Sequence, residues 1–188
     1  MQRPSTVRKE RDVNSNLRHA NHTVYVGAGS NMANRLDNLR KAIDLLNQLP
    51  RTSVKKASAV YHSEPLGFPA QGWFYNAVFE LRSELNPEAF LLLCKRIECL
   101  MGRPADHMKW GPRIIDLDIL LYDNSTCSQK HLTLPHPELS NRKFVLLPLL
   151  DLANPIHPLL GKTMQELLET CPDTSAIERT EHTLLTGS

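Results

Sequence analysis

The 188-residue sequence predicts an α+β fold in which two helices cover one face of an antiparallel sheet. Segments that alternate apolar and polar residues, as strands do, are interspersed with segments that repeat apolar residues every three or four positions, as helices do. Along the chain these segments follow the order β-α-β and then β-α-β, and the last strand, at 114–122, is dense in β-branched and aliphatic residues. That order is the ferredoxin-like β-α-β-β-α-β sandwich, to which the remainder should add C-terminal helical elements.

Length and composition predict one domain. The chain is 41% hydrophobic and 22% charged, which is ordinary for a globular protein with a single core. We expect that domain at 23–175, a disordered tail at 1–22 and a loose tail at 176–188. The first tail holds five basic residues and two acidic ones, so the rest of the chain lacks the basic excess of a nucleic-acid binder.

The expected compartment is the cytoplasm. No apolar run approaches the ~20 residues of a membrane span, and the N-terminus lacks the apolar core of a signal peptide. The four cysteines show no C-x-x-C spacing, so we expect free thiols in a reducing environment. We therefore expect no membrane partner, and a monomer, although the sequence leaves oligomers open.

The first half of the chain supplies a strand at 23–28, a helix at 36–49 and a strand at 52–61. Gly27-Ala28-Gly29 is a weak match to a dinucleotide-binding loop, because Met32 stands where that loop needs its third glycine.

A third strand is expected at 73–81, with Phe74 and Asn76 on the same face. An asparagine on an apolar face needs a partner, which is either a neighbouring side chain or a ligand. Asn86 and Pro87 then begin a second helix as N-cap and first residue.

The residues after 123 are Pro-rich and less regular. Lys143 to Leu152 predicts a helix start or two short turns, and Thr163 with Glu166 predicts a capping box. Gly161-Lys162-Thr163 is rejected as a phosphate loop, because position 156 is Ile instead of Gly.

The strand at 114–122 carries the strongest chemical signal. Alternation places Ile115, Leu117, Ile119 and Leu121 on one apolar face and Asp116 with Asp118 on the other. Two neighbouring carboxylates repel each other, and a cation relieves the repulsion. Oxygen ligands favour Mg²⁺, which takes its other ligands from water and phosphates. A solvated strand face is the plain alternative.

The surroundings favour the metal. Basic side chains flank the pair, namely Arg103, Lys109, Arg113 and Arg142, and groups that could hold a flat ring are Phe74, Asn76, Trp110 and Phe144. Metal and cations together suit a polyphosphate, because phosphoryl transfer depends on positioning and charge neutralisation.

With these features, the sequence resembles the 6-hydroxymethyl-7,8-dihydropterin pyrophosphokinase family over about 24–161. The central match is Trp110-Gly111-Pro112-Arg113-Ile114-Ile115-Asp116-Leu117-Asp118-Ile119-Leu120. Supporting matches are Gly29-Ser30-Asn31, Tyr61-His62-Ser63-Glu64-Pro65-Leu66-Gly67, Phe74-Tyr75-Asn76-Ala77, Gly102-Arg103, Leu134-Pro135-His136 and Asn141-Arg142 with Phe144.

The resemblance implies that ATP donates its β,γ-pyrophosphoryl group to the hydroxymethyl oxygen of the pterin in folate biosynthesis, and that AMP leaves. It implies two Mg²⁺ ions on Asp116 and Asp118. The other implied roles are phosphate contacts by Arg103 and Arg113, further nucleotide contacts by His136, Arg142 and Glu98, and pterin contacts by Ser63, Leu66, Phe74, Asn76, Trp110 and Phe144.

One departure from the family pattern lies in the connector before the acidic strand. Relatives often carry a second arginine soon after the one matching Arg103, where this chain reads Pro104-Ala105-Asp106-His107. Lys109 or His107 is our hypothesis for a partial substitute. Among other functions, a nucleotidyltransferase would release pyrophosphate instead of AMP. A ferredoxin-like RNA-binding module would display basic and aromatic residues where this chain has two acids.

Overall fold

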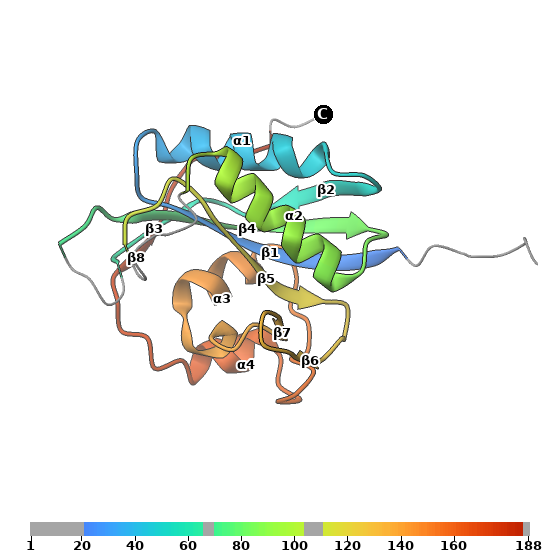
Figure 1. Cartoon of the computed structure of the whole chain (residues 1–188). Coiled ribbons are helices and arrows are strands. Elements are labelled where there is room, and N and C mark those ends of the chain that lie inside the picture. The colour runs from blue at the N-terminus through green and yellow to red at the C-terminus, as the bar shows by residue number, and fades with distance from the viewer. Residues whose placement is uncertain (1–20, 66–69, 104–110, 186–188) are drawn as a thin grey trace, which may run out of the picture.

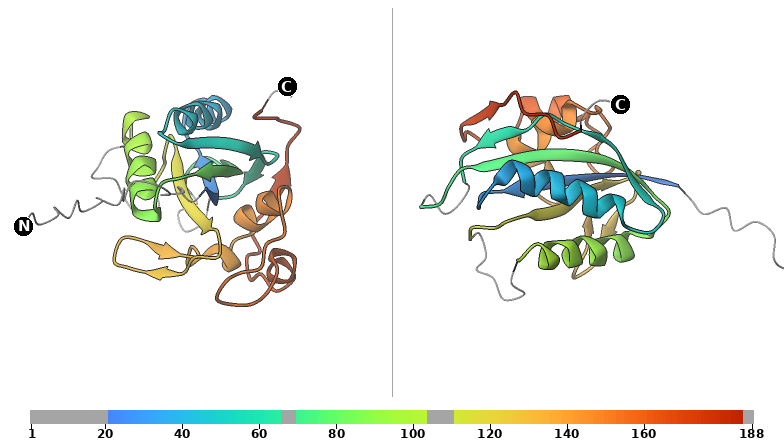
Figure 2. Two further views of the ribbon diagram at one scale, coloured as in Figure 1. Left: turned by 90° about the vertical axis from the view of Figure 1, so that its right-hand side faces the viewer. Right: turned by 90° about the horizontal axis from the view of Figure 1, so that it is seen from above.

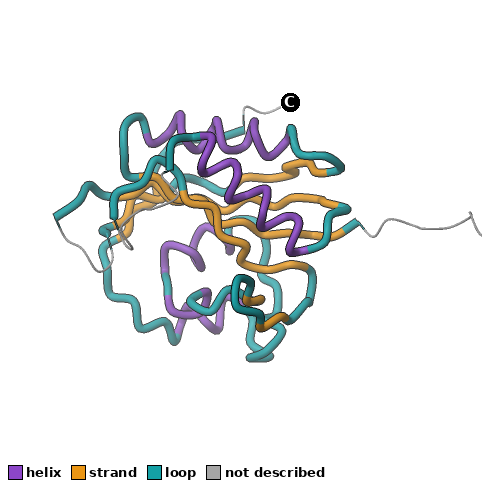
Figure 3. Tube along the Cα trace, in the orientation of Figure 1, coloured by secondary structure: helices purple, strands orange, loops and turns teal. Residues whose placement is uncertain are grey.

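The computed structural model describes residues 21–65, 70–103 and 111–185. Within these residues an antiparallel sheet forms the middle layer, and Figure 1 shows helices both above and below it. Figure 3 shows the same layers with the strands between the helices. The helices are α1 (Arg35–Asn47) and α2 (Pro87–Leu100) on one face, and α3 (Lys143–Leu150) and α4 (Met164–Glu169) on the other.

The strand order confirms the predicted ferredoxin-like sandwich. In the 6-stranded sheet the order is β5-β1-β4-β3-β8, with β2 also paired to β4, and the pairs are antiparallel. Figure 2 shows the twist of this sheet from two further sides. The strands are β1 (His22–Ser30), β2 (Thr52–Ala57), β3 (Tyr61–Ser63), β4 (Phe74–Ser83), β5 (Asp116–Tyr122) and β8 (Ile177–Arg179). A separate small sheet joins β6 (Cys127–Ser128) to β7 (Thr133–Leu134), and a short 3-10 helix spans Leu139–Asn141.

Each face of the sheet has its own apolar cluster. Phe79 and Leu117 point toward α1 and α2, where they pack with Leu39 and Phe90. Alternate residues such as Val78 point the other way and pack against α3 and α4. The sheet is therefore covered on both faces, whereas the sequence predicted helices on one face and unplaced elements at the C-terminus.

One residue of the acidic strand was assigned to the wrong face. Leu121 was expected beside Leu117 and Ile119, but it lies with Leu120 in the cluster under α3. The cause is a bulge: Ile119 pairs with Val26 and Leu121 pairs with Tyr25, so Leu120 is an extra residue that reverses the alternation. Asp116 and Asp118 precede the bulge and keep the predicted common face.

The predicted strand at 52–61 is two strands. β2 ends at Ala57: at the next residue Ser58 N still donates to Val78 O at 2.9 Å, but Val78 N donates to the Ser58 hydroxyl, at 2.9 Å, instead of to a backbone carbonyl. Ala59 N donates to the Asp151 carboxylate at 3.1 Å, and pairing resumes at β3. Side-chain acceptors therefore interrupt a ladder that strand propensity alone would continue.

The helix ends follow local rules. Asn86 accepts from Ala89 N at 2.8 Å as the N-cap of α2, with Pro at its start, and Thr163 with Glu166 forms the predicted capping box of α4. The segment from Lys143 is a single helix, α3, with Pro148 inside it. No helix among the described residues is both long and apolar enough to cross a membrane.

Both predicted tails need revision. β1 begins at His22, the last residue of the expected N-terminal tail, and residues 1–20 lie outside the described part. The expectation of a loose tail from 176 is wrong for β8, whose residues Ile177–Arg179 pair with β3. Its short length and polar composition hid it, because an edge strand needs backbone pairing more than an apolar pattern.

Candidate active site

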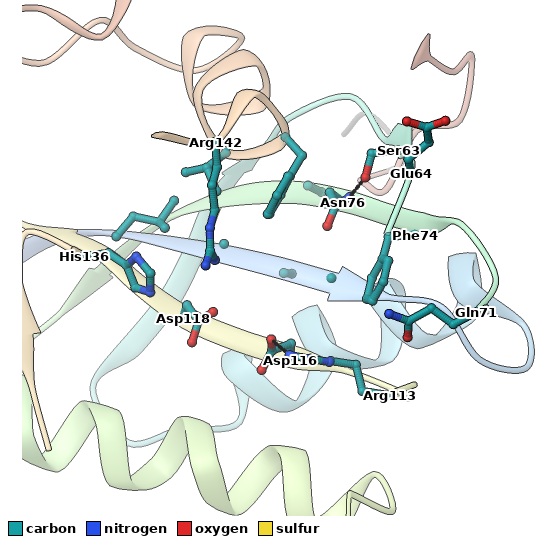
Figure 4. A pocket seen from close by; sticks show the side chains of 17 residues that line it. Ser63, Glu64, Gln71, Phe74, Asn76, Arg113, Asp116, Asp118, His136 and Arg142 are labelled. Carbon is teal, nitrogen blue, oxygen red and sulfur yellow. Dashed lines mark hydrogen bonds and ion pairs between the residues drawn. The ribbon is translucent and has the colours of Figure 1, made fainter. Parts of the chain in front are cut away.

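A pocket opens on the face of the sheet that also carries α3, at one end of β1, β4 and β5 (Figure 4). Its lining combines glycines, aromatic rings, amides and charges. The lining residues are Gly27, Ala28, Gly29, Ser63, Glu64, Gln71, Phe74, Asn76, Ala77, Arg113, Asp116, Asp118, Leu120, His136, Arg142, Phe144 and Val145.

The two carboxylates of β5 face this pocket together, as the alternation predicted. Asp116 accepts hydrogen bonds from the guanidiniums of Arg103 and Arg113, one on each oxygen. Burial by itself would raise the pKa of Asp116, but Arg113 and Arg103 outweigh it and hold that pKa below its usual value. Asp116 is therefore a carboxylate at neutral pH.

A second layer of charges lies behind the acidic pair, on α2. The Glu98 carboxylate is buried, accepts from Leu117 N at 2.7 Å and pairs with Arg103 at 2.8 Å. Lys95 Nζ lies 2.8 Å from Glu98, donates to Leu117 O at 3.2 Å, and lies 3.7 Å from Asp118 Oδ1. These bonds fix the position of β5 along α2 and orient the side chains of both aspartates.

The floor of the pocket exists because β1 has glycines there. A Cβ added to Gly29 would stand 2.9 Å from Asn76 Oδ1, and one added to Gly27 would stand 3.3 Å from a methyl group of Leu120. The Gly27-Ala28-Gly29 stretch is thus a strand whose missing side chains leave room between β4 and β5. This is a different use of glycine from a dinucleotide-binding turn.

Rings and amides line the end of the pocket away from His136. Asn76 Nδ2 donates to Ser63 Oγ at 2.7 Å, which answers its need for a partner and fixes the amide. Phe74 stands on the same face of β4, and Phe144 comes from α3 on the opposite wall. The Arg142 guanidinium lies 5.7 Å from the Phe144 ring centre. Rings on two walls can stack on a flat, polar molecule between them.

Asn31 connects two parts of the rim. Its side-chain oxygen accepts from Arg113 N at 2.7 Å, and its own N–H donates to Arg113 O at 3.1 Å. Its amide nitrogen donates to Gln71 at 3.0 Å and to Gly72 O at 3.3 Å. Asn31 therefore holds the segment before β5 against the segment before β4.

A second pocket adjoins the first and shares Asp118 and His136 with it. Its other lining residues are Leu91, Lys95, Ile119, Lys130, His131, Leu132, Thr133 and Pro137. Burial lowers the pKa of His136 and Arg142 lowers it further, against the opposing effect of Asp118. His136 is therefore neutral at pH 7 and can both donate and accept hydrogen bonds.

The structure brings most of the expected site residues together. Those that line the first pocket are Ser63, Phe74, Asn76, Arg113, Asp116, Asp118, His136, Arg142 and Phe144. Glu98 and Arg103 are absent from the lining of both described pockets and lie behind Asp116. Leu66, His107, Lys109 and Trp110 fall outside the described residues, so their roles stay predictions.

Sequence reasoning missed four contributors: Gln71, Glu64, Asn31 as a clamp, and Lys95. In the sequence, Asn31 stands out only as the last residue of the Gly29-Ser30-Asn31 motif. Lys95 stands three residues before Glu98 on a predicted helix, so the i,i+3 pairing rule could have found the pair. The contact of Lys95 with Asp118 depends on how α2 packs on β5, which has no local signal.

The donor set fits Mg²⁺ bound with a substrate. The described residues contain no cluster of three or more His, Cys, Asp or Glu side chains placed to hold a metal by themselves. Two carboxylates on one strand face suffice for Mg²⁺, which keeps waters and takes phosphate oxygens. Both oxygens of Asp116 bind arginines, so metal binding there requires those guanidiniums to turn elsewhere, and a polyphosphate would attract them.

Fold and pocket together define a class: a ferredoxin-like α+β protein with a small-molecule site in which two carboxylates meet several arginines. A model of the 7,8-dihydro-6-hydroxymethylpterin-pyrophosphokinase (HPPK) family matches residues 25–154. The chain belongs to this family, as the motifs around Asp116 predicted.

Two bacterial relatives illustrate the match. The 2-amino-4-hydroxy-6-hydroxymethyldihydropteridine pyrophosphokinase of Aquifex aeolicus is 42% identical over 145 residues, covering 77% of this chain and 89% of the relative. That of Methylorubrum extorquens is 39% identical over 157 residues, covering 84% and 98%.

Among solved structures, wild-type Plasmodium falciparum HPPK-DHPS has a TM-score of 0.64 at 15% identity, over 80% of this chain and 45% of that chain. This chain thus spans less than half of that longer protein, and at this identity the likeness supports the fold alone. The family is one of pyrophosphokinases, so the chain is a pyrophosphokinase.

Proposed function

We propose that the chain transfers pyrophosphate from ATP to the hydroxymethyl group of 6-hydroxymethyl-7,8-dihydropterin, releasing AMP, in an Mg²⁺-dependent step of folate biosynthesis. One observation carries the proposal: a ring-and-amide pocket opens directly onto Asp116 and Asp118 with their arginines. A pterin held at one end would place its hydroxymethyl oxygen near phosphates held at the other. We also propose that the enzyme acts as a cytoplasmic monomer, which sedimentation of the purified protein can test for its oligomeric state.

The pterin would lie between Phe74 and Phe144, with its polar edge on Asn76 and on backbone groups near Ser63. The Ser63 hydroxyl fixes the Asn76 amide before the substrate arrives, so little ordering is needed on binding. Stacking between rings from two elements excludes water from both faces of the substrate.

The nucleotide would lie in the second pocket, with its phosphates directed toward Asp118. Lys95 and Lys130 give that pocket a positive lining, and His131 adds a ring that can hydrogen-bond. The neutral His136, shared by both pockets, would donate a hydrogen bond to a phosphate oxygen. Arg113 and Arg142 would contact the transferred group from opposite walls.

The reaction itself exchanges one P–O bond for another. The hydroxymethyl oxygen forms a bond to the β-phosphorus, the bond from that phosphorus to the oxygen of the AMP phosphate breaks, and the hydroxyl proton is released. Asp116 and Asp118 would hold two Mg²⁺ ions, whose charge would neutralise and align the triphosphate. Arg103 and Arg113 would move from Asp116 onto the phosphates as that charge accumulates.

A single incubation tests the proposal. The purified protein is mixed with ATP, Mg²⁺ and the hydroxymethyl-dihydropterin, and the products are separated by ion-exchange chromatography. We expect AMP and a pyrophosphorylated pterin in equal amounts, and no product when EDTA removes the metal. ADP would indicate single-phosphate transfer, and free pyrophosphate would indicate nucleotidyl transfer; either result contradicts the proposal.

A further inference from the structure

The segment from Asp173 to Arg179 lies outside the stretch matched by the family, 25–154, yet it contacts both walls of the first pocket. We call this segment the C-terminal strap. One wall is the end of β3 with Ser63 and Glu64, and the other is the start of α3 with Arg142 and Phe144. Figure 1 shows the strap running from the region of α4 up to the sheet edge at β3.

At one end the strap fixes the start of α3. Asp173 is 9% exposed, and its Oδ2 accepts a hydrogen bond from Lys143 N at 2.9 Å. Lys143 is the first residue of α3, and its N–H has no carbonyl partner inside the helix. A carboxylate supplied from 30 residues further along the chain therefore replaces the usual local cap. This bond sits between Arg142 and Phe144, so it fixes the backbone from which both side chains enter the pocket.

The second oxygen of Asp173 is used to hold the strap itself. Oδ1 accepts from Ser175 N at 2.9 Å and from the Ser175 hydroxyl at 2.6 Å. This local turn directs the following residue, Ala176, toward the opposite wall.

At its other end the strap fixes the rim of β3. Glu64 N donates to Ala176 O at 3.1 Å, and Ala176 N donates to the Glu64 carboxylate at 3.0 Å. The next residue, Ile177, pairs with Ser63, whose hydroxyl in turn accepts from Asn76. The backbone of the strap thus holds Glu64 and Ser63 directly, and it holds Asn76 through Ser63.

We propose that the C-terminal strap is a positioning element for the pterin, with Asp173 as its main positioning residue; this inference rests on the proposed function of the pocket. The strap joins β3 to α3 by bonds at both ends and so sets the separation of the two walls. A flat ring stacked between walls is sensitive to that separation, because dispersion contacts weaken steeply when a gap opens. The nucleotide pocket shares none of these contacts among its lining residues.

Residues just beyond the strap hold its far end without involving Asp173. Thr180 donates to Val60 O from both its backbone nitrogen, at 2.9 Å, and its hydroxyl, at 2.8 Å. Leu184 is buried in the cluster under α1 and α2. Removing the Asp173 carboxylate should therefore loosen one end of the strap while β8 stays paired.

The test compares Asp173→Ala with Asp173→Asn and with Glu181→Ala, an exposed acidic residue just beyond the strap. Pterin binding is followed by its fluorescence, and KM is measured separately for pterin and ATP. We expect Asp173→Ala to weaken pterin binding about fivefold, or about 1 kcal/mol, because the start of α3 is then no longer held where Phe144 can stack on the ring. Asp173→Asn keeps one carbonyl acceptor for Lys143 N and should recover part of that loss. Glu181→Ala should match the wild type, and KM for ATP should stay within about twofold throughout.

A purely structural role would give a different result: Asp173→Ala would lower the melting temperature and leave the pterin dissociation constant unchanged, which would overturn the inference. Equal losses of pterin and ATP affinity would also overturn it. If Asp173→Ala does not fold, Ala176→Pro removes one N–H donor at an exposed position and must show the same selective loss. A wild-type protein that binds no pterin would instead refute the proposed function.

Discussion

The two faces of the same sheet are built differently. Toward α1 and α2, the strands present apolar side chains from one end to the other, such as Val26, Phe79 and Leu117. Toward α3, the face is apolar at one end, with Val78 and Leu121, and polar at the other, with Asn76 and Asp116. The first face contributes packing along its whole length. The second face uses one end for packing and the other end for binding.

The difference shows how one strand can serve both purposes. β5 sends Leu117 and Ile119 into the core under α1 and α2 and sends Asp116 and Asp118 into the pocket. The bulge at Leu120 then turns Leu121 away from the helices and into the second cluster. The strand is thereby held by packing on either side of its acidic pair, which keeps two costly charges in a fixed place.

Phe79→Ala should have the largest effect on the all-apolar face. Phe79 is 0% exposed, so its truncation leaves a cavity and should lower the free energy of unfolding by about 3–5 kcal/mol. Urea denaturation measures this. Leu92→Ala, on the exposed side of α2, is the control and should stay within about 0.5 kcal/mol of the wild type. If Phe79→Ala lost activity with unchanged stability, the division of roles between the faces would be wrong.

Asp116→Asn and Asp118→Asn, at the polar end of the other face, should lower activity and leave stability nearly unchanged. Each keeps the side-chain shape and removes a charge that stabilises the reacting phosphates. We therefore expect the turnover rate to fall by about 10²–10³-fold, with the fold retained. Initial rates of AMP formation and a circular dichroism spectrum test both parts. Asp44→Asn, exposed on α1, should keep the wild-type rate; wild-type rates in both site variants would contradict the metal role.

Gly29→Ala should narrow the pocket without weakening the core. The new methyl group would stand 2.9 Å from Asn76 Oδ1, so the amide must move, and pterin binding should weaken by about tenfold, or about 1.4 kcal/mol. Gly27→Ala is the matched control: its contact is a flexible Leu120 methyl at 3.3 Å, so its effect should be smaller. Isothermal titration with the pterin ranks the two variants. Equal losses of pterin affinity in the two variants would mean that the contact with Asn76 does not cause the weaker binding.

The smallest effect concerns pH and the turn that precedes α4. His157 is buried beside α4, its Nδ1 accepts from Leu159 N and Leu160 N, and burial lowers its pKa below 6.5. The unfolded chain then binds a proton more readily than the folded one. Its contribution to stability is therefore complete above about pH 6.5 and declines as the pH falls through the window below that value.

Thermal unfolding at several pH values between 5 and 8 tests this sign. The wild type should lose stability toward pH 5, and His157→Asn, which keeps an acceptor but cannot be protonated there, should lose less. His131→Asn removes an exposed histidine and should leave the wild-type slope unchanged. If the melting temperature fell more steeply toward pH 5 in His157→Asn than in the wild type, His157 would not be the source of the pH dependence.

Local patterns predicted much of the fold. The caps at Asn86 and Thr163 and the common face of Asp116 and Asp118 depend on residues within a few positions of one another, and all three were confirmed. The errors arose where a distant group intervenes. Ser58 interrupts a strand through Val78, and Leu121 changes face through a bulge against β1.

The β-α-β-β-α-β order of the first two thirds of the chain, the acidic strand and the family follow from the sequence alone, because each depends on short-range spacing or on a contiguous motif. Three features become visible only in the folded protein: α3 and α4 cover the second face of the sheet, Glu98 and Arg103 lie behind Asp116, and β8 extends the sheet at β3. The fold also joins Asp173 to the start of α3. These features depend on contacts between residues tens of positions apart, and such contacts form only when the packed core brings the segments together.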